Sequence, residues 1–171
     1  MRELEIIFTK SKKKCAIISF LIRKWTGKQY SHVARKLVHG DIELYYQASG
    51  SQVNYECKEV FDKKHEIIKR YTLSISQELY TEIGSACLRE AGKPYGVLQN
   101  VGIAMVDVCR LFGKKIQNPF KQGRNCSELL YVVVLKRLCP DLAYDPDTIK
   151  PNHIEEILID LCEKGLFCKR H

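Results

Sequence analysis

Cys126 is a candidate nucleophile because of the residues on either side of it. It follows Asn125 and precedes an apolar run, Leu129 to Leu135, and Glu128 stands three residues after Asn125. Asn is a favoured helix cap and Glu at this spacing completes a capping box, so the pattern predicts a buried helix beginning at Cys126. The unpaired N–H groups at a helix start favour a thiolate and could bind an oxyanion. The chain has eight cysteines, and a purely structural Cys126 is the alternative.

His32 and Gln47 lie on two strand-like segments that His39, Gly40 and Asp41 separate. If His39 and Gly40 form a two-residue hairpin loop, His32 falls directly opposite Gln47, with the two Cβ atoms about 5 Å apart. If Gly40 and Asp41 form the loop, the two residues are diagonal neighbours on the same face. In both registers Gln47 could orient the imidazole of a His32 that acts as a base toward a thiol. Two unrelated surface side chains on a hairpin are the alternative.

The remaining pattern predicts one α+β domain over residues 1–171, with strands early and helices late. Short apolar or alternating segments predict strands, and apolar residues at helical spacing predict helices, of which the first is expected to be buried. The expected strands are Glu3 to Phe8, Ser31 to Val38, Ile42 to Ala48, Gln52 to Val60 and Glu66 to Leu73. The expected helices are Cys15 to Lys24, Ser76 to Glu90, Val97 to Phe112, Asn125 to Leu138 and Asn152 to Glu163, the last also opening with a capping-box pattern.

Four segments, in this order along the chain, resemble the YiiX-like branch of the permuted NlpC-type hydrolases, a subdivision of the papain-like fold. The family places a histidine strand first, a Y-E-A strand after it, then a G-x-P-Y segment, and a nucleophile helix that opens with C-S-E. The corresponding segments here are Ile22 to Val33, Tyr45 to Ala48, Gly92 to Gly96, and Asn125 to Leu129, and a late turn at Pro151 to Ile154 also resembles the family.

The resemblance implies a permuted papain-like fold, with an antiparallel sheet packed against a central helix that carries the nucleophile. It implies that Cys126 attacks a peptide, amide or acyl-ester carbonyl and forms a thioester, with His32 as base. Gln47 stands where the family more often has Glu, and an uncharged amide would stabilise an imidazolium less. Tyr95 would line the substrate pocket, although a core tyrosine is equally consistent. Acyl transfer, as in the related lecithin:retinol acyltransferase-like branch, could use the same residues.

The net charge of +8 and a pI near 9.0 predict weak attraction to nucleic acid and acidic surfaces. The basic residues cluster at 10–14 and at 114–124, but no recognised nucleic-acid-binding motif accompanies them. Two alternatives to an enzyme therefore remain open. One is a catalytically silent papain-like binding module, and the other is a basic nucleic-acid-binding protein of unrelated ancestry.

The cysteines show no disulfide framework, and no signal peptide or transmembrane segment is visible, so we expect free thiols and a cytoplasmic protein. The sequence contains no CxxC and no HExxH, and its five histidines are not spaced as metal ligands. We therefore expect no metal and no cofactor.

Overall fold

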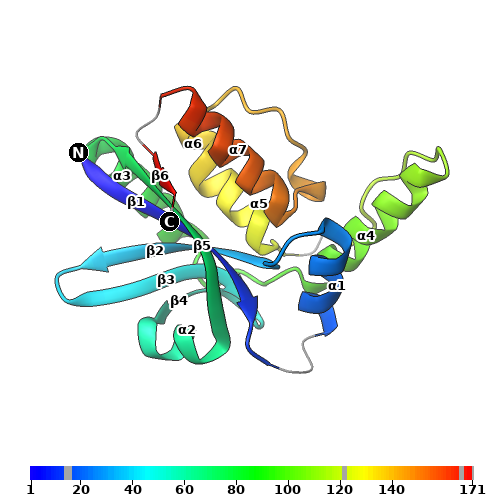
Figure 1. The fold of residues 1–171 in the computed structure, drawn as a ribbon, viewed down its shortest axis with the longest axis horizontal. Helices are drawn as coiled ribbons and strands as arrows, with labels where there is room; N and C mark the ends of the chain where they lie inside the picture. Colours follow the sequence, from blue (N-terminus) through cyan, green and yellow to red (C-terminus); the bar gives the residue numbers. More distant parts are fainter. Residues whose placement is uncertain (14–16, 121–122, 166–167, 171) are drawn as a thin grey trace.

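The computed structural model describes residues 1–13, 17–120, 123–165 and 168–170. Six strands form one antiparallel sheet in the order β4-β3-β2-β1-β5-β6 (Figure 1). The strands are β1 (Arg2–Ser11), β2 (His32–His39), β3 (Ile42–Ser49), β4 (Gln52–Cys57), β5 (His65–Ile75) and β6 (Cys168–Arg170). The helices are α1 (Ile17–Thr26), α2 (Lys58–Lys64), α3 (Gln77–Glu90), α4 (Val97–Leu111), α5 (Cys126–Leu130), α6 (Lys136–Leu138) and α7 (Pro151–Glu163).

Strand β1 is buried on both faces of the sheet, and this divides the core in two. Leu4, Ile6 and Phe8 point into the larger core, which lies under α3, α5 and α7. Ile7 points to the other face and packs with Phe61 of α2. This alternation is what a strand with period two requires when helices cover both of its faces. The expected mixed α and β architecture with an antiparallel sheet is confirmed.

The apolar segment after Cys126 lies against the sheet, as its composition predicts. Helix α5 contacts β2 and β3 and continues without a break through a π-helical turn, Tyr131–Leu135, into α6. Figure 1 shows α5, α6 and α7 side by side over one face of the sheet. Because a helix that is apolar on nearly all sides must be surrounded, α7 and α3 cover what the sheet does not.

The hairpin between β2 and β3 uses the second of the two possible loops. His39 pairs with Ile42, so Gly40 and Asp41 form the loop, and the register that makes His39 part of the turn is wrong. Gly40 has φ 59°, and glycine at the first loop position is the type II′ arrangement that suits twisted strands. A loop over His39 and Gly40 would instead need positive φ at His39. His32 and Gln47 are therefore diagonal neighbours.

Two segments differ from their expected structure. The segment Gln52 to Val60 is not one strand: β4 ends at Cys57, and α2 follows because its Phe61 ring stacks on Tyr45, with centroids 4.0 Å apart. The first helix is not buried, since most of its large apolar side chains face outward at one end of the molecule, next to α4. Its first expected residue, Cys15, lies outside the described residues.

The start of α7 also differs from the capping box expected at Asn152. The helix begins two residues earlier than a cap at Asn152 requires, with Lys150 as its N-cap and Pro151 as its first residue, and the Lys150 N–H donates to His153 Nδ1 at 3.3 Å. Proline suits this position because it has no N–H to satisfy. Glu155, expected as the reciprocal partner in the box, points into the protein.

Glu155 is instead the centre of a buried ionic cluster that ties α7 to the sheet. Its carboxylate accepts hydrogen bonds from Lys28 at 3.0 Å, Lys69 at 2.5 Å, Tyr30 at 2.5 Å and Tyr71 at 3.1 Å. These donors lower the pKa of Glu155 to about 2, although burial by itself raises it. A buried carboxylate is tolerated when it is paired in this way. The cluster fixes α7, and through it α5, over the sheet.

Among the helices in the described part of the chain, we find none with the length and apolar character needed to cross a membrane.

Candidate active site

Cys126 is the first residue of α5, as its position after Asn125 predicts. The Asn125 side-chain oxygen accepts hydrogen bonds from the backbone N–H groups of Ser127 and Glu128, both at 2.9 Å. The cap thus uses the amides of the second and third helical residues. The Cys126 amide, one position earlier, is therefore placed to donate to an oxyanion that forms next to its own sulfur.

A side chain from α4 supports this helix start. Gln99 Oε1 accepts the Asn125 backbone N–H at 2.8 Å, and Gln99 Nε2 donates to Glu128 at 2.7 Å. Arg124 also donates to Glu128, at 3.0 Å. The sequence analysis missed Gln99, because nothing local to position 99 indicates that α4 packs against the start of α5. Gln99 holds the start of α5 in place without contacting the Cys126 thiol in any described hydrogen bond.

His32 is held by Gln47, and the direction of each hydrogen bond in the chain can be assigned. The two side chains meet at 2.8 Å between His32 Nε2 and Gln47 Oε1. Gln47 Nε2 donates to the Glu56 carboxylate at 2.9 Å, and a carboxylate can only accept, so the amide cannot be flipped. Gln47 Oε1 therefore faces the ring, and His32 Nε2 must carry the proton. The other ring nitrogen, Nδ1, is left to exchange a proton with Cys126.

Glu56 supplies the negative charge that Gln47 lacks, and the sequence analysis missed it. Gln47 pairs with Asn54 across the β3–β4 hairpin, so Glu56, two residues further on, is its diagonal neighbour on the same face. Lys64 forms an ion pair with the outer side of the Glu56 carboxylate. The turn at Gly50 could have indicated Glu56 from sequence. A two-residue loop at this turn pairs Gln47 with Asn54 and so places Glu56 diagonally opposite Gln47.

The thiol and the imidazole change each other's pKa in the direction of an ion pair. Burial raises the pKa of Cys126, but the positive charge of His32, its hydrogen bond, and the Val33 backbone N–H more than offset this, so the pKa lies below the ordinary value. Burial lowers the pKa of His32, and the Cys126 thiolate, then Gln47 and Glu56, raise it above the ordinary value. The arrangement therefore favours a thiolate and an imidazolium, with 4% of Cys126 and 9% of His32 exposed.

His65 is a second histidine in the site, and the sequence analysis found no role for it. Its ring stacks on His32, with centroids 5.1 Å apart, and on Phe61 at 4.5 Å. Thr9 Oγ1 lies 3.3 Å from His65 Nδ1. Burial, followed by the charges of His32 and Lys64, lowers the pKa of His65 to about 3. His65 is thus neutral at pH 7, and it packs against the His32 ring without competing for its proton.

Tyr95 is close enough to Cys126 for the charge of the thiolate to act on its phenol. Burial and then the negative charge of the Cys126 thiolate raise the pKa of the Tyr95 phenol, so it stays protonated. Asn100 Nδ2 lies 3.3 Å from the Tyr95 hydroxyl oxygen, which accepts from it. The hydroxyl keeps its own proton to donate. Whether Tyr95 contacts a substrate stays a prediction.

A glycine allows the Tyr95 segment to lie against the chain that leads to Cys126. Tyr95 and Arg124 form a parallel bridge, and Gly123 has φ 76° just before it. A Cβ at Gly123 would lie 2.6 Å from the Pro94 carbonyl oxygen, so a side chain there would push the two segments apart. Positive φ is a second reason for glycine at this position.

No group of three or more His, Cys, Asp or Glu side chains in the described ranges is arranged so that it could hold a metal ion. Candidate ligands such as Cys126, His32 and Glu56 are engaged in the hydrogen-bonded chain described above.

The expectation that all eight cysteines are free is wrong, because Cys162 takes part in a disulfide bond. Compartment and spacing along the chain do not decide this, because a disulfide depends on how two cysteines approach in the fold, with Cβ atoms about 3.5–4.5 Å apart and a suitable dihedral angle. Cys126 is a free thiol, as the candidate chemistry requires, and so are four others: Cys57, Cys87, Cys109 and Cys139.

We expect Glu56→Gln to lower the pKa of His32, because the variant removes the carboxylate charge behind Gln47. The fraction of His32 that is imidazolium at neutral pH should fall, and alkylation of Cys126 should slow a few-fold at pH 6 to 7. NMR titration of the His32 ring measures the first effect directly. Glu59→Gln, an exposed change on the adjacent helix α2, is the control. An unchanged His32 titration in Glu56→Gln would show that Gln47 transmits no charge.

No family model and no curated protein matches this sequence. Among solved structures, the chain is similar to the crystal structure of the metalloprotein YiiX from Escherichia coli O157:H7, DUF1105, with a TM-score of 0.51 and 18% identity. The match covers 78% of this chain and 64% of that one, so this chain spans slightly less than two thirds of the length of YiiX. At this identity the likeness concerns the fold alone, and it supports a YiiX-like structural relationship.

Proposed function

We propose that this chain is a cysteine hydrolase of the permuted papain-like, NlpC type, acting on a peptide, amide or acyl-ester bond. The observation that carries the proposal is the hydrogen-bonded chain Glu56–Gln47–His32, which leaves His32 Nδ1 for the Cys126 thiol. The YiiX-like arrangement and the order of His32 before Cys126 agree with it. A silent binding module would not need a base whose tautomer is set in this way.

In the proposed reaction, His32 takes the thiol proton and the Cys126 sulfur bonds to the substrate carbonyl carbon. The carbonyl oxygen becomes an oxyanion, which the Cys126 amide and the Tyr95 hydroxyl could bind. When the C–N or C–O bond breaks, the His32 imidazolium protonates the leaving nitrogen or oxygen. Water then attacks the thioester carbonyl carbon while His32 takes a proton from the water. The C–S bond breaks, the carboxylic acid leaves, and the proton on His32 returns to the Cys126 sulfur.

An activated ester tests the proposal without knowledge of the natural substrate. With p-nitrophenyl acetate we expect a burst of nitrophenol and an acetyl adduct that mass spectrometry locates on Cys126. Cys126→Ala should abolish both, whereas Cys57→Ala, which removes an exposed free thiol, should retain them. Addition of an amine or alcohol acceptor separates acyl transfer from hydrolysis. Absence of a Cys126 adduct across ester and thioester probes would favour the binding-module alternative.

A further inference from the structure

The surface formed by α1 and α4 exposes more large apolar side chains than folding explains. On α1, Phe20, Leu21 and Trp25 are exposed, and Trp25 is 46% accessible. On α4, exposed apolar residues follow one another at intervals of three and four, which places them on one face of the helix. They are Leu98, Val101, Met105 and Val108, and the stripe ends at Leu111 and Phe112, which are 80% and 77% exposed.

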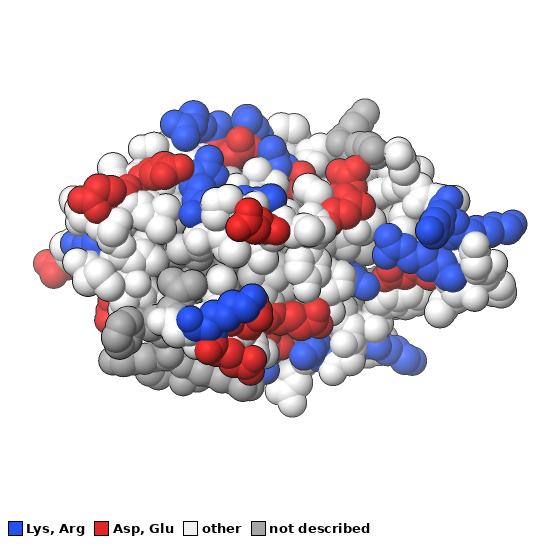
Figure 2. Space-filling model, turned by 90° about the horizontal axis from the view of Figure 1, so that it is seen from above, with Lys and Arg blue, Asp and Glu red and all other residues white. Residues whose placement is uncertain are grey.

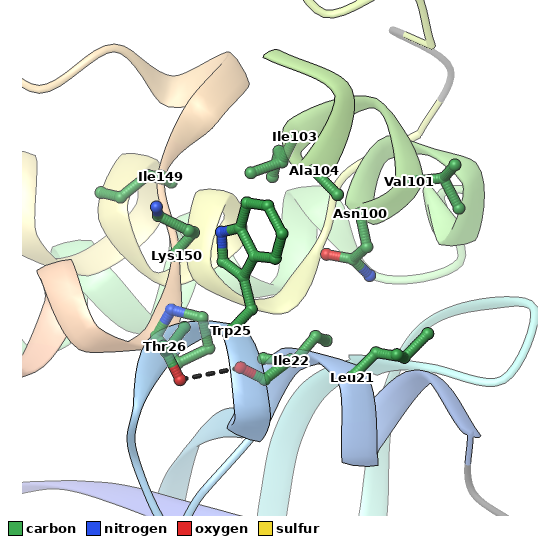
Figure 3. Close-up of a pocket in the computed structure, with 11 residues that line it drawn as sticks. Leu21, Ile22, Trp25, Thr26, Asn100, Val101, Ile103, Ala104, Ile149 and Lys150 are labelled. Carbon is green, nitrogen blue, oxygen red and sulfur yellow. Dashed lines mark hydrogen bonds between the residues drawn. The ribbon is translucent and has the colours of Figure 1, made fainter. Parts of the chain in front are cut away.

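The two helices form one continuous surface, because a groove of about 290 Å³ joins them. Leu21 and Trp25 of α1 line one side of this groove, and Val101 and Ala104 of α4 line the other (Figure 3). The Trp25 indole N–H donates to Asp107 on α4 at 2.9 Å and fixes the two helices together. Exposed apolar surface on this scale marks an interaction site.

This end of the molecule is positively charged. Figure 2 shows Lys and Arg side chains gathered where α4 projects from the body. The basic residues of α1, α4 and the six residues after α4 are Arg23, Lys24, Arg110, Lys114 and Lys115. The one acid in these segments, Asp107, is paired with Lys150 at 2.8 Å and with Arg110 at 3.9 Å. The apolar stripe therefore ends beside Lys114 and Lys115, for which these segments supply no acid in the described contacts.

We propose that the α1–α4 surface binds an anionic phospholipid bilayer, with the end of α4 inserted among the headgroups. A helix with an apolar face and flanking Lys and Arg residues lies at such an interface, where the apolar side chains reach the acyl chains and the cations pair with lipid phosphates. A second copy of the chain is the rival occupant. Self-association would bring two basic patches together, whereas an anionic bilayer is complementary to them. This proposal is independent of the proposed enzymatic activity.

The single tryptophan of the chain, Trp25, reports on this surface directly. With vesicles of equal parts phosphatidylglycerol and phosphatidylcholine, we expect the protein to co-float and the Trp25 emission to shift to shorter wavelength. Vesicles of phosphatidylcholine alone should bind much less protein. Added salt should weaken binding to the mixed vesicles, because it screens the phosphate contacts.

Two variants separate the apolar and the charged contributions. Leu111→Ser with Phe112→Ser should reduce vesicle binding at least about tenfold, because both side chains leave water on insertion. Lys114→Glu with Lys115→Glu should remove the preference for phosphatidylglycerol. Leu88→Ser with Arg89→Glu is the matched control, since it changes an exposed apolar and an exposed basic residue on α3, at the other end of the molecule.

All of the varied positions are exposed, so the variants should fold, and circular dichroism checks this. Equal binding of the wild type to the two kinds of vesicle would overturn the proposal. So would a Leu111→Ser, Phe112→Ser variant that binds vesicles as the wild type does. Light scattering that finds a wild-type dimer dissociated by this variant, without vesicle binding, would assign the surface to a second copy instead.

Discussion

Alkylation of Cys126 by iodoacetamide at pH 6 should slow at least about tenfold in His32→Ala, because the imidazolium stabilises the thiolate. The thiolate is the reacting species, so the wild-type rate should persist well below the free-thiol pKa of about 8.5. Without His32, burial and the remaining backbone donors act alone, and the pH profile should move upward. Peptide mass spectrometry after timed labelling measures the rate at Cys126 separately from the other thiols. Iodoacetamide suits this test because Cys126 is almost covered.

His39→Ala is the control for this experiment, since His39 lies on the same strand at its exposed end. Its Cys126 profile should match that of the wild type. Exposed Cys57 serves as an internal standard in every sample, because it has no imidazole partner in any described contact. Gln47→Ala should have a smaller effect than His32→Ala, because it loosens the ring without removing its charge. A Cys126 that titrates like Cys57 in all of these proteins would rule out the activated pair.

Glu155→Gln should lower the free energy of unfolding at pH 7 by about 3 kcal/mol, because the pKa of Glu155 is lowered from 4.5 to about 2 in the folded protein. The variant leaves Lys28 and Lys69 without their shared carboxylate. A folded-state pKa below the unfolded value means that this stabilisation is complete above about pH 4.5. It is lost as the pH falls from there toward 2. The difference between wild type and variant should therefore shrink over that range.

Urea unfolding at pH 7, 4.5 and 3 measures this dependence. Glu156→Gln is the matched control, because Glu156 is the next residue of α7 and faces solvent, where it accepts a hydrogen bond from Asn152. Such a surface change should alter stability by less than about 0.5 kcal/mol. Equal losses in the two variants would mean that the buried cluster contributes nothing beyond an exposed carboxylate.

The position of Cys126 could be predicted from sequence because it depends on local contacts. The Asn125 side chain reaches only the next two or three amides, so four consecutive residues are enough to define the helix start. The pairing of His32 with Gln47 was likewise predictable, since both loop choices leave the two residues on one face. The choice between the loops came down to backbone conformation, because Gly40 takes positive φ and His39 does not.

The residues that complete the site depend on contacts between distant segments, which no local pattern encodes. Gln99 reaches the start of α5 from α4, and His65 reaches His32 only because β1 lies between β2 and β5. The contact of Glu56 with Gln47 depends on the register of a second hairpin, the one between β3 and β4. In each case the side chain is ordinary for its own helix or strand, and its role arises from what packs against it.

Tertiary structure decided which residues are buried, both for a charged residue that lies in the interior and for apolar residues that lie on the surface. The pattern at the start of α7 predicts that Glu155 caps the helix, yet the surrounding lysines and tyrosines hold its carboxylate in the interior. The apolar residues of α1 predict a buried helix, but the core under α5 and α7 is complete without them. Sequence by itself determined which segments are apolar and where the helix that starts at Cys126 begins. Only the tertiary structure decided which apolar surfaces are covered, because coverage depends on the space that the other segments leave.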